Sequence, residues 1–513
     1  MFSSQSIDYS LSIPTRCLAS LPSRSPSAKP PPSSPTADEN DQDGWGDDDS
    51  LQFDDALNED THRFLVGTAH PSISKPDDNE ASEDEENNQL HVLSYHEDSH
   101  EITLDASYPH PNGEVWAMAP HPKNETVVTC GGGVYLSGEE GAASGSKLME
   151  FKTVLWKMSN GDDEDFGLSS GPTLEPLITI PHGESAAVQT GWEKRVGCIL
   201  WSPALSSDDS FDEQEVTASL LTVGWDASSP ISLWDLSASC AVETWSYNKS
   251  TESGRSRYNL QSALPRRASW DPHEPTNILC TENQDIIAYD TRSAAGADGV
   301  GVIQNAHRYG VTSVDHNRLQ EHVVVTSGMD GVVKFWDLRM HLSSRDDNCL
   351  PPAKILKTVR GGHSHWVTRA SYNPFYDQLV LSGGTDGIAN LWRISSCSSA
   401  PLLDFADDEE VNNSGEDANE GDDDGGDGNW AGEQEAGSLV DPVEDEHRDE
   451  EKKEGTSSKP SSNDIRVSRY ECSDTTADVC WSASDPWMYA TLSCDGSLAV
   501  HHVPSKEKYK ILL

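Results

Sequence analysis

Two groups of side chains in this chain repeat the composition of a nucleophile, its base and an orienting acid. Each group combines a histidine, a hydroxyl residue, an aspartate and a tryptophan at the same spacing: His307, Thr326, Asp330 and Trp336, then His363, Ser382, Asp386 and Trp392. In hydrolases such groups activate the hydroxyl for attack on a carbonyl. An active site is normally single, whereas a packing device recurs in every repeat. We therefore interpret both groups as buried hydrogen-bond networks, and we expect no catalytic residue and no cofactor.

The segments that position these groups form a repeated pair of strands. Residues 326–339 (TSGMDGVVKFWDLR) and 381–394 (LSGGTDGIANLWRI) each contain a small-residue strand, an Asp-Gly turn and an apolar strand that reaches a tryptophan. Asp-Gly favours the tight turn of a β-hairpin. Repetition of this hairpin, with a Gly-His dipeptide before the second copy, is the signature of WD40 propeller blades. Trp234 and Asp235 mark the same position in an earlier repeat, so we add them to the structural network.

Weaker copies of the hairpin extend this pattern through most of the chain. Seven units can be traced, with Tyr289 in place of the tryptophan in the fourth unit and His501 in the last. We therefore predict an all-β fold, a single WD40 β-propeller with seven blades. Residues 9–20 are expected to form an inner strand of the first blade. The final blade is expected to be complete within the C-terminal segment, which would end in a strand, and a latch from the N-terminus is left open.

Acidic and Ser/Pro-rich stretches interrupt the repeats, and blades tolerate such loops at small entropic cost. Residues 38–60 alone carry eleven acidic residues and no basic one. These stretches have too few apolar residues to fold by themselves, so we expect them to be disordered. The predicted organisation is residues 1–20 with the first inner strand, a disordered insert at 21–60, six blades at 61–400 with an acidic loop at 71–88, a disordered acidic insert at 401–463 and the final blade at 464–513.

Charge and cysteine content disfavour several classes of function. The net charge is -51, which opposes direct binding of nucleic acid. The ten cysteines include no CxxC pair, which argues against disulfides or zinc and for a reducing compartment. No apolar run reaches membrane-spanning length, so we expect a cytoplasmic protein. His501 and His502 are strand neighbours that point to opposite faces, so we interpret them as surface and edge residues and expect no metal site.

Candidate partner-binding residues lie in one loop and in two acidic segments. His365 and Trp366 directly precede a predicted inner strand, where aromatic side chains could form a recognition surface. The alternative is that Trp366 packs beneath the buried His363. Trp45 and Trp430 are lone tryptophans in acidic segments that offer no core for them to join. They are either docking motifs that order on binding or parts of solvated spacers.

Taken together, these stretches resemble the EARP- and GARP-complex-interacting protein family. The matching residues are RFLVGT at 63–68, GEVW at 113–116, YDTR at 289–292, NAH at 305–307, VKFWD at 333–337, HSHWV at 363–367, YDQLVLSG at 376–383, SASDPWMYATLSCDG at 482–496 and the terminal KYKILL. The resemblance implies a non-enzymatic adaptor that binds EARP or GARP tether subunits at recycling endosomes and the trans-Golgi network. It also implies that membrane association is indirect, through partners, and that the protein acts as a monomer within a larger complex.

Two other partner classes remain open. Trp336, Asp337 and Arg339 resemble the box through which some propellers dock onto the DDB-type adaptor of cullin ubiquitin ligases, and Arg292 offers a second copy. Under this alternative the protein is a substrate receptor. The simpler interpretation is that the arginine caps the outer part of the blade. A histone escort, in which the acidic segments pair with basic tails, is a weaker alternative because the inserts are dispersed.

Overall fold

The structure is a computed structural model that describes residues 6–22, 61–70, 88–136, 148–159, 171–182, 195–203, 218–226, 229–237, 240–247, 265–293, 299–339, 353–400 and 464–512. All of these residues belong to one compact unit. It consists of antiparallel strands, with a short helix at the C-terminal end of the described chain. None of the helical segments described has the length and the apolar character that crossing a membrane requires.

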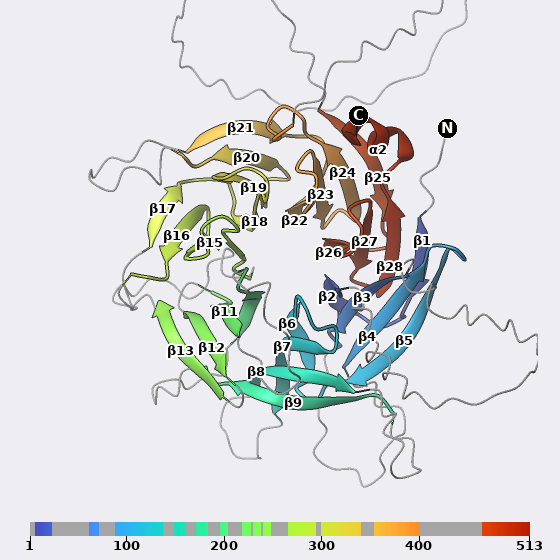
Figure 1. Ribbon diagram of the computed structural model, residues 1–513, viewed down its shortest axis with the longest axis vertical. Helices are drawn as coiled ribbons and strands as arrows, with labels where there is room; N and C mark the ends of the chain where they lie inside the picture. The colour runs from blue at the N-terminus through green and yellow to red at the C-terminus, as the bar shows by residue number, and fades with distance from the viewer. Residues whose placement is uncertain are drawn as a thin grey trace, which may run out of the picture. The chain divides into compact units, whose positions relative to one another are not determined.

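Seven four-stranded sheets form the blades of a ring (Figure 1). The first four blades each use consecutive strands, which run in chain order from the centre outward. Blade 1 contains β2 (Thr15–Ser20), β3 (Thr61–Thr68), β4 (Gln89–His96) and β5 (Glu101–Pro109). Blade 2 contains β6 (Glu114–Pro120), β7 (Val127–Leu136), β8 (Leu148–Ser159) and β9 (Thr173–Ile180), and blade 3 contains β10 (Val196–Trp201), β11 (Ala218–Gly224), β12 (Ile231–Ser237) and β13 (Cys240–Tyr247). Blade 4 contains β14 (Ala268–Trp270), β15 (Asn277–Glu282), β16 (Asp285–Asp290) and β17 (Val300–Ile303).

The last three blades complete the ring. Blade 5 contains β18 (Val311–His316), β19 (Val323–Gly328), β20 (Val333–Asp337) and β21 (Lys354–Val359); blade 6 contains β22 (Val367–Tyr372), β23 (Leu379–Gly384), β24 (Ile388–Arg393) and β25 (Ile465–Glu471); blade 7 contains β26 (Thr476–Trp481), β27 (Met488–Ser493), β28 (Ser497–His502) and β1 (Ile7–Ser10). The prediction of an all-β propeller with seven blades is confirmed.

Blade 7 combines strands from both ends of the described chain. β1 supplies its outermost strand and pairs with β28, so that Ile7 lies opposite Val500. The expectation that the final blade is complete within the C-terminal segment is therefore wrong. The expected single strand over residues 9–20 is wrong as well, because a turn that includes Ser12, with φ of 58°, separates β1 from β2. Hydrogen bonding between the first and last strands closes the ring and covers the edge of β28 that would otherwise be unpaired.

The boundary predicted before the final blade also needs correction. β25 pairs with β24 and completes blade 6, so the prediction that residues 464–513 form the final blade is wrong in part. Backbone hydrogen bonding decides this assignment, because β24 would otherwise leave an unpaired edge. The insert at 401–463 consequently separates the third and fourth strands of blade 6 and does not lie between two blades.

The terminal segment forms a helix where a strand was expected. Helix α2 (Ser505–Leu512) begins directly after Pro504, whose carbonyl oxygen accepts from the amide nitrogens of Glu507 and Lys508. An acidic residue in its first turn and a basic one in its last turn complement the helix dipole. A buried ion pair between Arg393 and Glu507 attaches α2 to blade 6.

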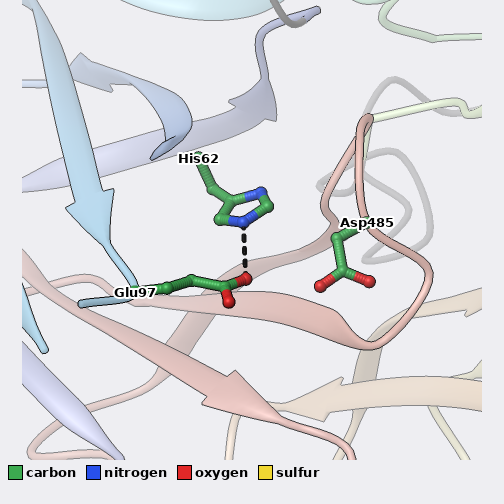
Figure 2. Close-up of side chains that lie close together, drawn as sticks. All are labelled: His62, Glu97 and Asp485. Carbon is green, nitrogen blue, oxygen red and sulfur yellow. Dashed lines mark hydrogen bonds and ion pairs between the residues drawn. The ribbon is translucent and has the colours of Figure 1, made fainter. Parts of the chain in front are cut away.

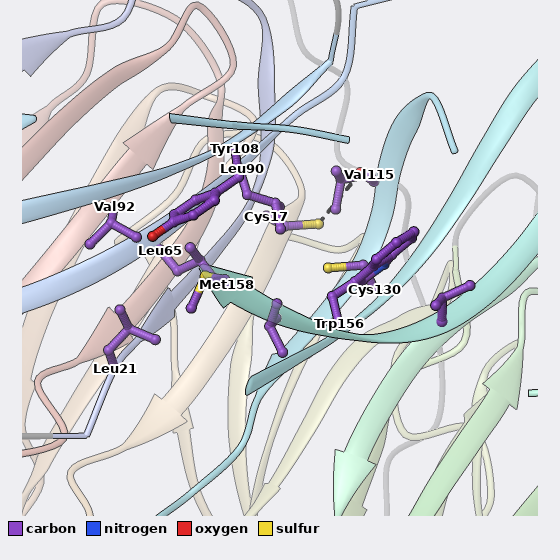
Figure 3. Close-up of a cluster of buried hydrophobic side chains, with 12 residues drawn as sticks. Cys17, Leu21, Leu65, Leu90, Val92, Tyr108, Val115, Cys130, Trp156 and Met158 are labelled. Atoms are coloured by element: carbon purple, nitrogen blue, oxygen red, sulfur yellow. Dashed lines mark hydrogen bonds between the residues drawn. The ribbon is translucent and has the colours of Figure 1, made fainter. Parts of the chain in front are cut away.

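The apolar core is divided among the interfaces between neighbouring blades. Each of seven clusters of buried side chains combines residues from two adjacent sheets. Between blades 1 and 2, for example, Leu65 and Leu90 belong to the same cluster as Cys130 and Trp156 (Figure 3). Every residue of β19 and β23 is buried, because neighbouring blades cover both faces of these strands. Each blade therefore depends on both of its neighbours to bury its apolar surface.

Candidate functional site

In blade 5, the four predicted network residues form one chain of hydrogen bonds. His307 precedes β18, Thr326 lies on β19, Asp330 lies in the following turn and Trp336 lies on β20. The His307 ring reaches Asp330 through Nδ1 at 2.9 Å and the Thr326 hydroxyl through Nε2 at 2.8 Å. Trp336 Nε1 donates to the same hydroxyl oxygen at 2.9 Å. The Thr326 oxygen accepts the hydrogen bond from the indole, so the hydroxyl proton of Thr326 can be donated to His307 Nε2. Nε2 is then the acceptor nitrogen of the ring, and the imidazole proton is assigned to Nδ1.

Blade 6 repeats this arrangement with a serine in place of the threonine. His363 Nδ1 lies 3.2 Å from Asp386 Oδ1, and Nε2 lies 2.8 Å from Ser382 Oγ. Trp392 Nε1 donates to Ser382 Oγ at 2.8 Å. Asn390 adds a further donor, since its Nδ2 lies 3.1 Å from His363 Nε2. The structure thus brings together each of the two sets that were chosen from their spacing.

Burial and hydrogen bonding set the protonation states of both networks. Burial lowers the pKa of His307 and His363 below the usual value, against the opposing effect of the neighbouring aspartates. Burial alone would raise the pKa of Asp330 and Asp386, but hydrogen bonds from the histidines and from backbone amides lower it on balance. Each network therefore contains a neutral imidazole and an ionised carboxylate at neutral pH.

The order of aspartate, histidine and hydroxyl is that of a catalytic triad, but both hydroxyls are inaccessible. Thr326 and Ser382 each have 0% exposed surface. A nucleophile and its base must come within hydrogen-bond distance of the substrate. Among the described residues, these hydroxyls form hydrogen bonds only with groups of their own network. The arrangement can hold loop and strands together, and it cannot present either hydroxyl to a substrate.

Blade 3 contains only part of such a network. Trp234 Nε1 donates to Thr222 Oγ1 at 2.8 Å, as the tryptophan and the hydroxyl do in blades 5 and 6. Asp235 is exposed, and within the described part of the chain no hydrogen bond joins it to this pair. Its assignment to the buried network is therefore wrong. It neighbours Trp234 on β12, and adjacent strand residues point to opposite faces.

Blade 7 uses a histidine at the tryptophan position. His501 has the same place in the strand pairing as Trp336. It is 3% exposed, and its Nε2 lies 2.9 Å from Thr491 Oγ1. The interpretation of His501 as a surface residue is therefore wrong, since the ring fills the space that an indole fills in other blades. His502, its neighbour, is half-buried.

Blade 2 has the histidine and the tryptophan but lacks the hydroxyl. Cys130 occupies the strand position that Thr326 has in blade 5. Trp156 pairs with Val128, and Cys130 follows Val128 by two residues, as Thr326 follows the partner of Trp336. The His110 ring lies edge-on to Trp156, with centroids 6.0 Å apart. Both His110 Nε2 and Trp156 Nε1 are buried, and neither has a hydrogen-bond partner among the residues described. A thiol is a weak donor and a weak acceptor, so packing takes the place of the hydrogen bonds that link histidine and tryptophan through a hydroxyl in blades 5 and 6.

Exposed aromatic rings lie two residues after the network histidines of blades 5 and 6. His365 is exposed and stacks on the half-buried Trp366, with ring centroids 5.0 Å apart and an interplanar angle of 27°. Its Nδ1 lies 2.5 Å from Thr385 Oγ1. In blade 5 the equivalent residue is Tyr309, which is 52% exposed. We refer to Tyr309, His365 and Trp366 as the aromatic loop patch.

The aromatic loop patch lies on the face of the ring where the inner strands β18 and β22 begin. Its loops are fixed by backbone contacts; the Thr385 amide, for example, donates to the Trp366 carbonyl oxygen at 2.8 Å. Arg308 lies over the Tyr309 ring, with its guanidinium carbon 5.2 Å from the centroid. Aromatic and arginine side chains are enriched at interface hot spots. Sequence reasoning missed Tyr309, although its position relative to the network histidine matches that of His365.

The residues of the alternative docking box lie at the end of β20. Asp337 is buried, and Arg339 Nε lies 3.0 and 2.9 Å from its two carboxylate oxygens. These hydrogen bonds lower the pKa of Asp337 below its usual value. The Arg339 side chain remains 69% exposed. Arg292 contacts Asp290 in the same way, with an Nε to Oδ1 distance of 2.9 Å. Each arginine is thus fixed by the aspartate two residues earlier and exposes its guanidinium.

Two predicted sites cannot be placed. Trp45 and Trp430 lie outside the described residues, as do most residues of the inserts predicted at 21–60, 71–88 and 401–463. Their interpretation as docking motifs or spacers therefore stays a prediction.

Seven blades, hydrogen-bonded His-Asp-hydroxyl-Trp sets and Asp-Gly turns define the protein as a WD40-type β-propeller. Comparison with known proteins shows what the chain is similar to. Residues 182–392 match the family model described as the EIPR1 beta-propeller. The chain is 28% identical over 464 residues to EARP and GARP complex-interacting protein 1 of Homo sapiens, a match that covers 88% of this chain and 94% of the human protein.

Two further relatives show the same similarity over most of the chain. EARP-interacting protein 1 of Caenorhabditis elegans is 26% identical over 458 residues, which cover 88% of this chain and 92% of the nematode protein. WD repeat-containing protein DWA2 of Arabidopsis thaliana is 23% identical over 420 residues, or 82% of this chain and 87% of the plant protein. The resemblance seen in the sequence is confirmed: the chain is similar to the EARP- and GARP-complex-interacting proteins over most of its length.

Proposed function

We propose that the protein is a non-enzymatic adaptor that binds multisubunit vesicle-tethering complexes of the EARP and GARP type. In this role it supports endosomal recycling and endosome-to-Golgi traffic. It acts from the cytoplasm, peripherally at endosomes and the trans-Golgi network, and its membrane association is indirect, through the tether. It works as a monomer within the larger complex, and nucleic acid is not a direct partner.

The observation that supports this proposal is the extent of the alignment with relatives that are named for interaction with EARP and GARP. The human protein aligns over 88% of this chain and 94% of its own length. The shared region is therefore the propeller as a whole and not a single repeat. The buried hydroxyls of Thr326 and Ser382 are consistent with the non-enzymatic part of the proposal.

The aromatic loop patch is the contact region that we propose for the tether. Its members come from two neighbouring loops, and each loop is attached to the sheet by a buried network. A partner that covers preorganised rings loses little conformational entropy on binding. Tyr309 and His365 are both exposed in the structure, so a partner could bury them without unfolding the loops.

Affinity purification of the full-length chain at physiological salt tests the proposal. EARP or GARP subunits should be recovered together with the chain. Because aromatic contacts are not screened by salt, recovery should persist when the ionic strength is raised severalfold. Absence of all EARP and GARP subunits from the purified material would contradict the proposal.

Arg339 supports one alternative, because its guanidinium is both exposed and held in place by Asp337. If the protein is a substrate receptor of a cullin-type ubiquitin ligase, the DDB-type adaptor should co-purify and Arg339→Ala should abolish its recovery. The tether proposal instead expects Arg339→Ala to leave the recovery of tether subunits unchanged. Histones that elute between about 0.15 and 0.5 M salt would indicate the third class, since charge pairing is screened in that range.

A further inference from the structure

Three side chains of metal-binding type meet where the ring closes (Figure 2). His62 lies on β3, Glu97 lies in the turn that follows β4, and Asp485 lies in the loop between β26 and β27. The first two belong to blade 1 and the third to blade 7, the two blades that join the ends of the chain. One potential ligand atom from each residue lies within 4.8 Å of the others.

Hydrogen bonds fix both ring nitrogens of the histidine. The His62 side chain is 5% exposed, and its Nε2 lies 2.9 Å from Glu97 Oε1. Its Nδ1 lies 3.0 Å from Ser484 Oγ and 3.3 Å from Ser482 Oγ. Metal-bound histidines characteristically form such a hydrogen bond through the second ring nitrogen, which fixes the tautomer and the ring orientation. The serines come from blade 7, so both blades position this ring.

Among the described residues, the two carboxylates have backbone and histidine partners but no lysine or arginine partner. Asp485 Oδ1 accepts from the Trp487 amide at 2.7 Å, which fixes the carboxylate in its loop. Within the described part of the chain, no lysine or arginine forms an ion pair with Glu97 or with Asp485. Two carboxylates this close repel each other in a partly buried setting. A bound divalent cation would offset that repulsion and would use the remaining oxygen atoms.

We propose that His62, Glu97 and Asp485 bind a divalent cation, with Zn2+ the best match, and that this ion links blade 1 to blade 7. One imidazole nitrogen and two carboxylate oxygens are a donor set that zinc accepts, with water at the open position. Zinc ligands at about 2.0–2.2 Å from the ion lie about 3.3 Å apart, so the three atoms must approach by up to about 1.5 Å. The Glu97 side chain is 38% exposed and lies in a turn, which permits this movement.

The consequence is a metal-dependent stability of the closed ring. An ion that binds the folded chain and not the unfolded chain stabilises the fold according to its concentration relative to Kd. With full-length protein freed of metal by a chelator, Zn2+ at about 100 times its Kd should raise the Tm by about 5 °C. The same concentration of Mg2+ should leave the Tm unchanged, because this cation prefers an all-oxygen set.

Conservative variants separate this site from other zinc-binding groups in the chain. Asp485→Asn keeps an oxygen that can accept from Trp487, and Glu97→Gln keeps a hydrogen-bonding partner for His62. Each should retain the Tm of the metal-free protein and lose the zinc-induced shift. Glu321→Gln is the matched control. Glu321 lies 4.0 Å from His322 and also forms an exposed carboxylate–histidine pair, but this pair has no third potential ligand among the described residues. This control should keep the full shift.

Co2+ gives a second measurement that does not depend on stability. A four-coordinate Co2+ at this site should absorb visible light in the wild type and in Glu321→Gln, and should not do so in Asp485→Asn. An absent zinc-induced shift in the wild type would overturn the proposal. An equal shift in Asp485→Asn and Glu97→Gln would also overturn it, since the ion would then bind elsewhere.

Discussion

At the scale of single residues, one hydroxyl decides whether the histidine and tryptophan of a blade join into a network. Blades 5 and 6 have Thr326 and Ser382 at the central position, whereas blade 2 has the fully buried Cys130. Trp156 Nε1 and His110 Nε2 consequently lack hydrogen-bond partners within the described residues. An unsatisfied buried donor costs about 1–3 kcal/mol. Blade 2 is therefore less stable than it would be with a hydroxyl residue at the position of Cys130.

We expect Cys130→Ser to raise the free energy of unfolding by about 1–2 kcal/mol, because the hydroxyl can accept from Trp156 and donate to His110. Unfolding in urea measures this change. Cys280→Ser is the matched control, since Cys280 has the same strand position in blade 4, where Tyr289 offers no indole N–H. The new hydroxyl there should lower stability. An equal loss of stability in both variants would contradict our account of the network.

Buried histidines should make the propeller sensitive to mild acid. Burial lowers the pKa of His91, His110 and His316 to about 4. The unfolded chain takes up these protons near pH 6.5, whereas the folded chain does so only near pH 4. Their contribution to stability is thus fully present above about pH 6.5 and is lost as the pH falls toward 4. The loss is about 3 kcal/mol for a fully buried ring such as His110.

Thermal unfolding between about pH 8 and pH 5 tests this expectation. The Tm should be nearly constant above about pH 7 and should fall below about pH 6.5. Asp330 and Asp386 have a lowered pKa, so their contribution is lost only in stronger acid, below about pH 4. Between about pH 6 and pH 5, the free energy of unfolding of His110→Gln should fall less steeply with decreasing pH than that of the wild type, by about 1.4 kcal/mol per pH unit. A Tm that does not change with pH would exclude this mechanism.

At the scale of strands and turns, local patterns predict the hairpins but not their partners in space. β19, β20, β23 and β24 follow from apolar alternation and Asp-Gly turns, which act over a few residues. β1 has four residues, only half of them partly buried, and its partner β28 lies at the other end of the chain. No local pattern encodes such a pairing. The sequence therefore predicts the number of blades and misses how the last blade is completed.

The Asp-Gly turns of blades 5, 6 and 7 also contact the backbone that leads into the next blade. Gly496, in the turn of blade 7, has φ of 94°, and its Cα faces the carbonyl oxygen of Ile13 at the entry to blade 1. Its own carbonyl oxygen accepts from the Leu11 amide at 3.1 Å. A side chain at Gly496 would therefore meet backbone that belongs to the ring closure.

We expect Gly496→Ala to lower the free energy of unfolding by about 3 kcal/mol, because a Cβ adds a backbone clash to the strain of a positive φ. Gly361→Ala is the control, since Gly361 has φ of 76° and open space around the added atom. It should cost about 1 kcal/mol, which reflects the positive φ alone. Urea unfolding of both variants measures the difference. Similar costs in the two variants would show that the contact with Ile13 does not stabilise the closure.

At the scale of the whole molecule, the ring divides one large core into seven shared interfaces. The interface between blades 7 and 1 combines Leu492 and Leu498 with Phe64 and Leu93, so residues from both ends of the chain complete it. A closed ring of this kind holds its loops rigidly and presents separate faces to different partners. This property suits an adaptor, which holds its partners in place and catalyses no reaction.

The same long-range arrangement limits what the sequence can show of the candidate sites. His365 and Trp366 could be selected because they lie beside a motif that is visible in the sequence. The cluster of His62, Glu97 and Asp485 could not, because ring closure alone brings together residues that lie in the first and last blades. Local spacing therefore finds sites within a blade and misses sites between blades.

The most direct test of the adaptor account is the affinity of purified EARP or GARP complex for the full-length chain. The double variant Tyr309→Ala with His365→Ala removes two exposed rings and should weaken binding at least about tenfold. Phe375→Ala is the matched control, because Phe375 is 45% exposed but follows β22, at the opposite face of the ring. This control should bind as the wild type does. Unchanged affinity in the double variant, or no binding of either complex to the wild type, would contradict the account.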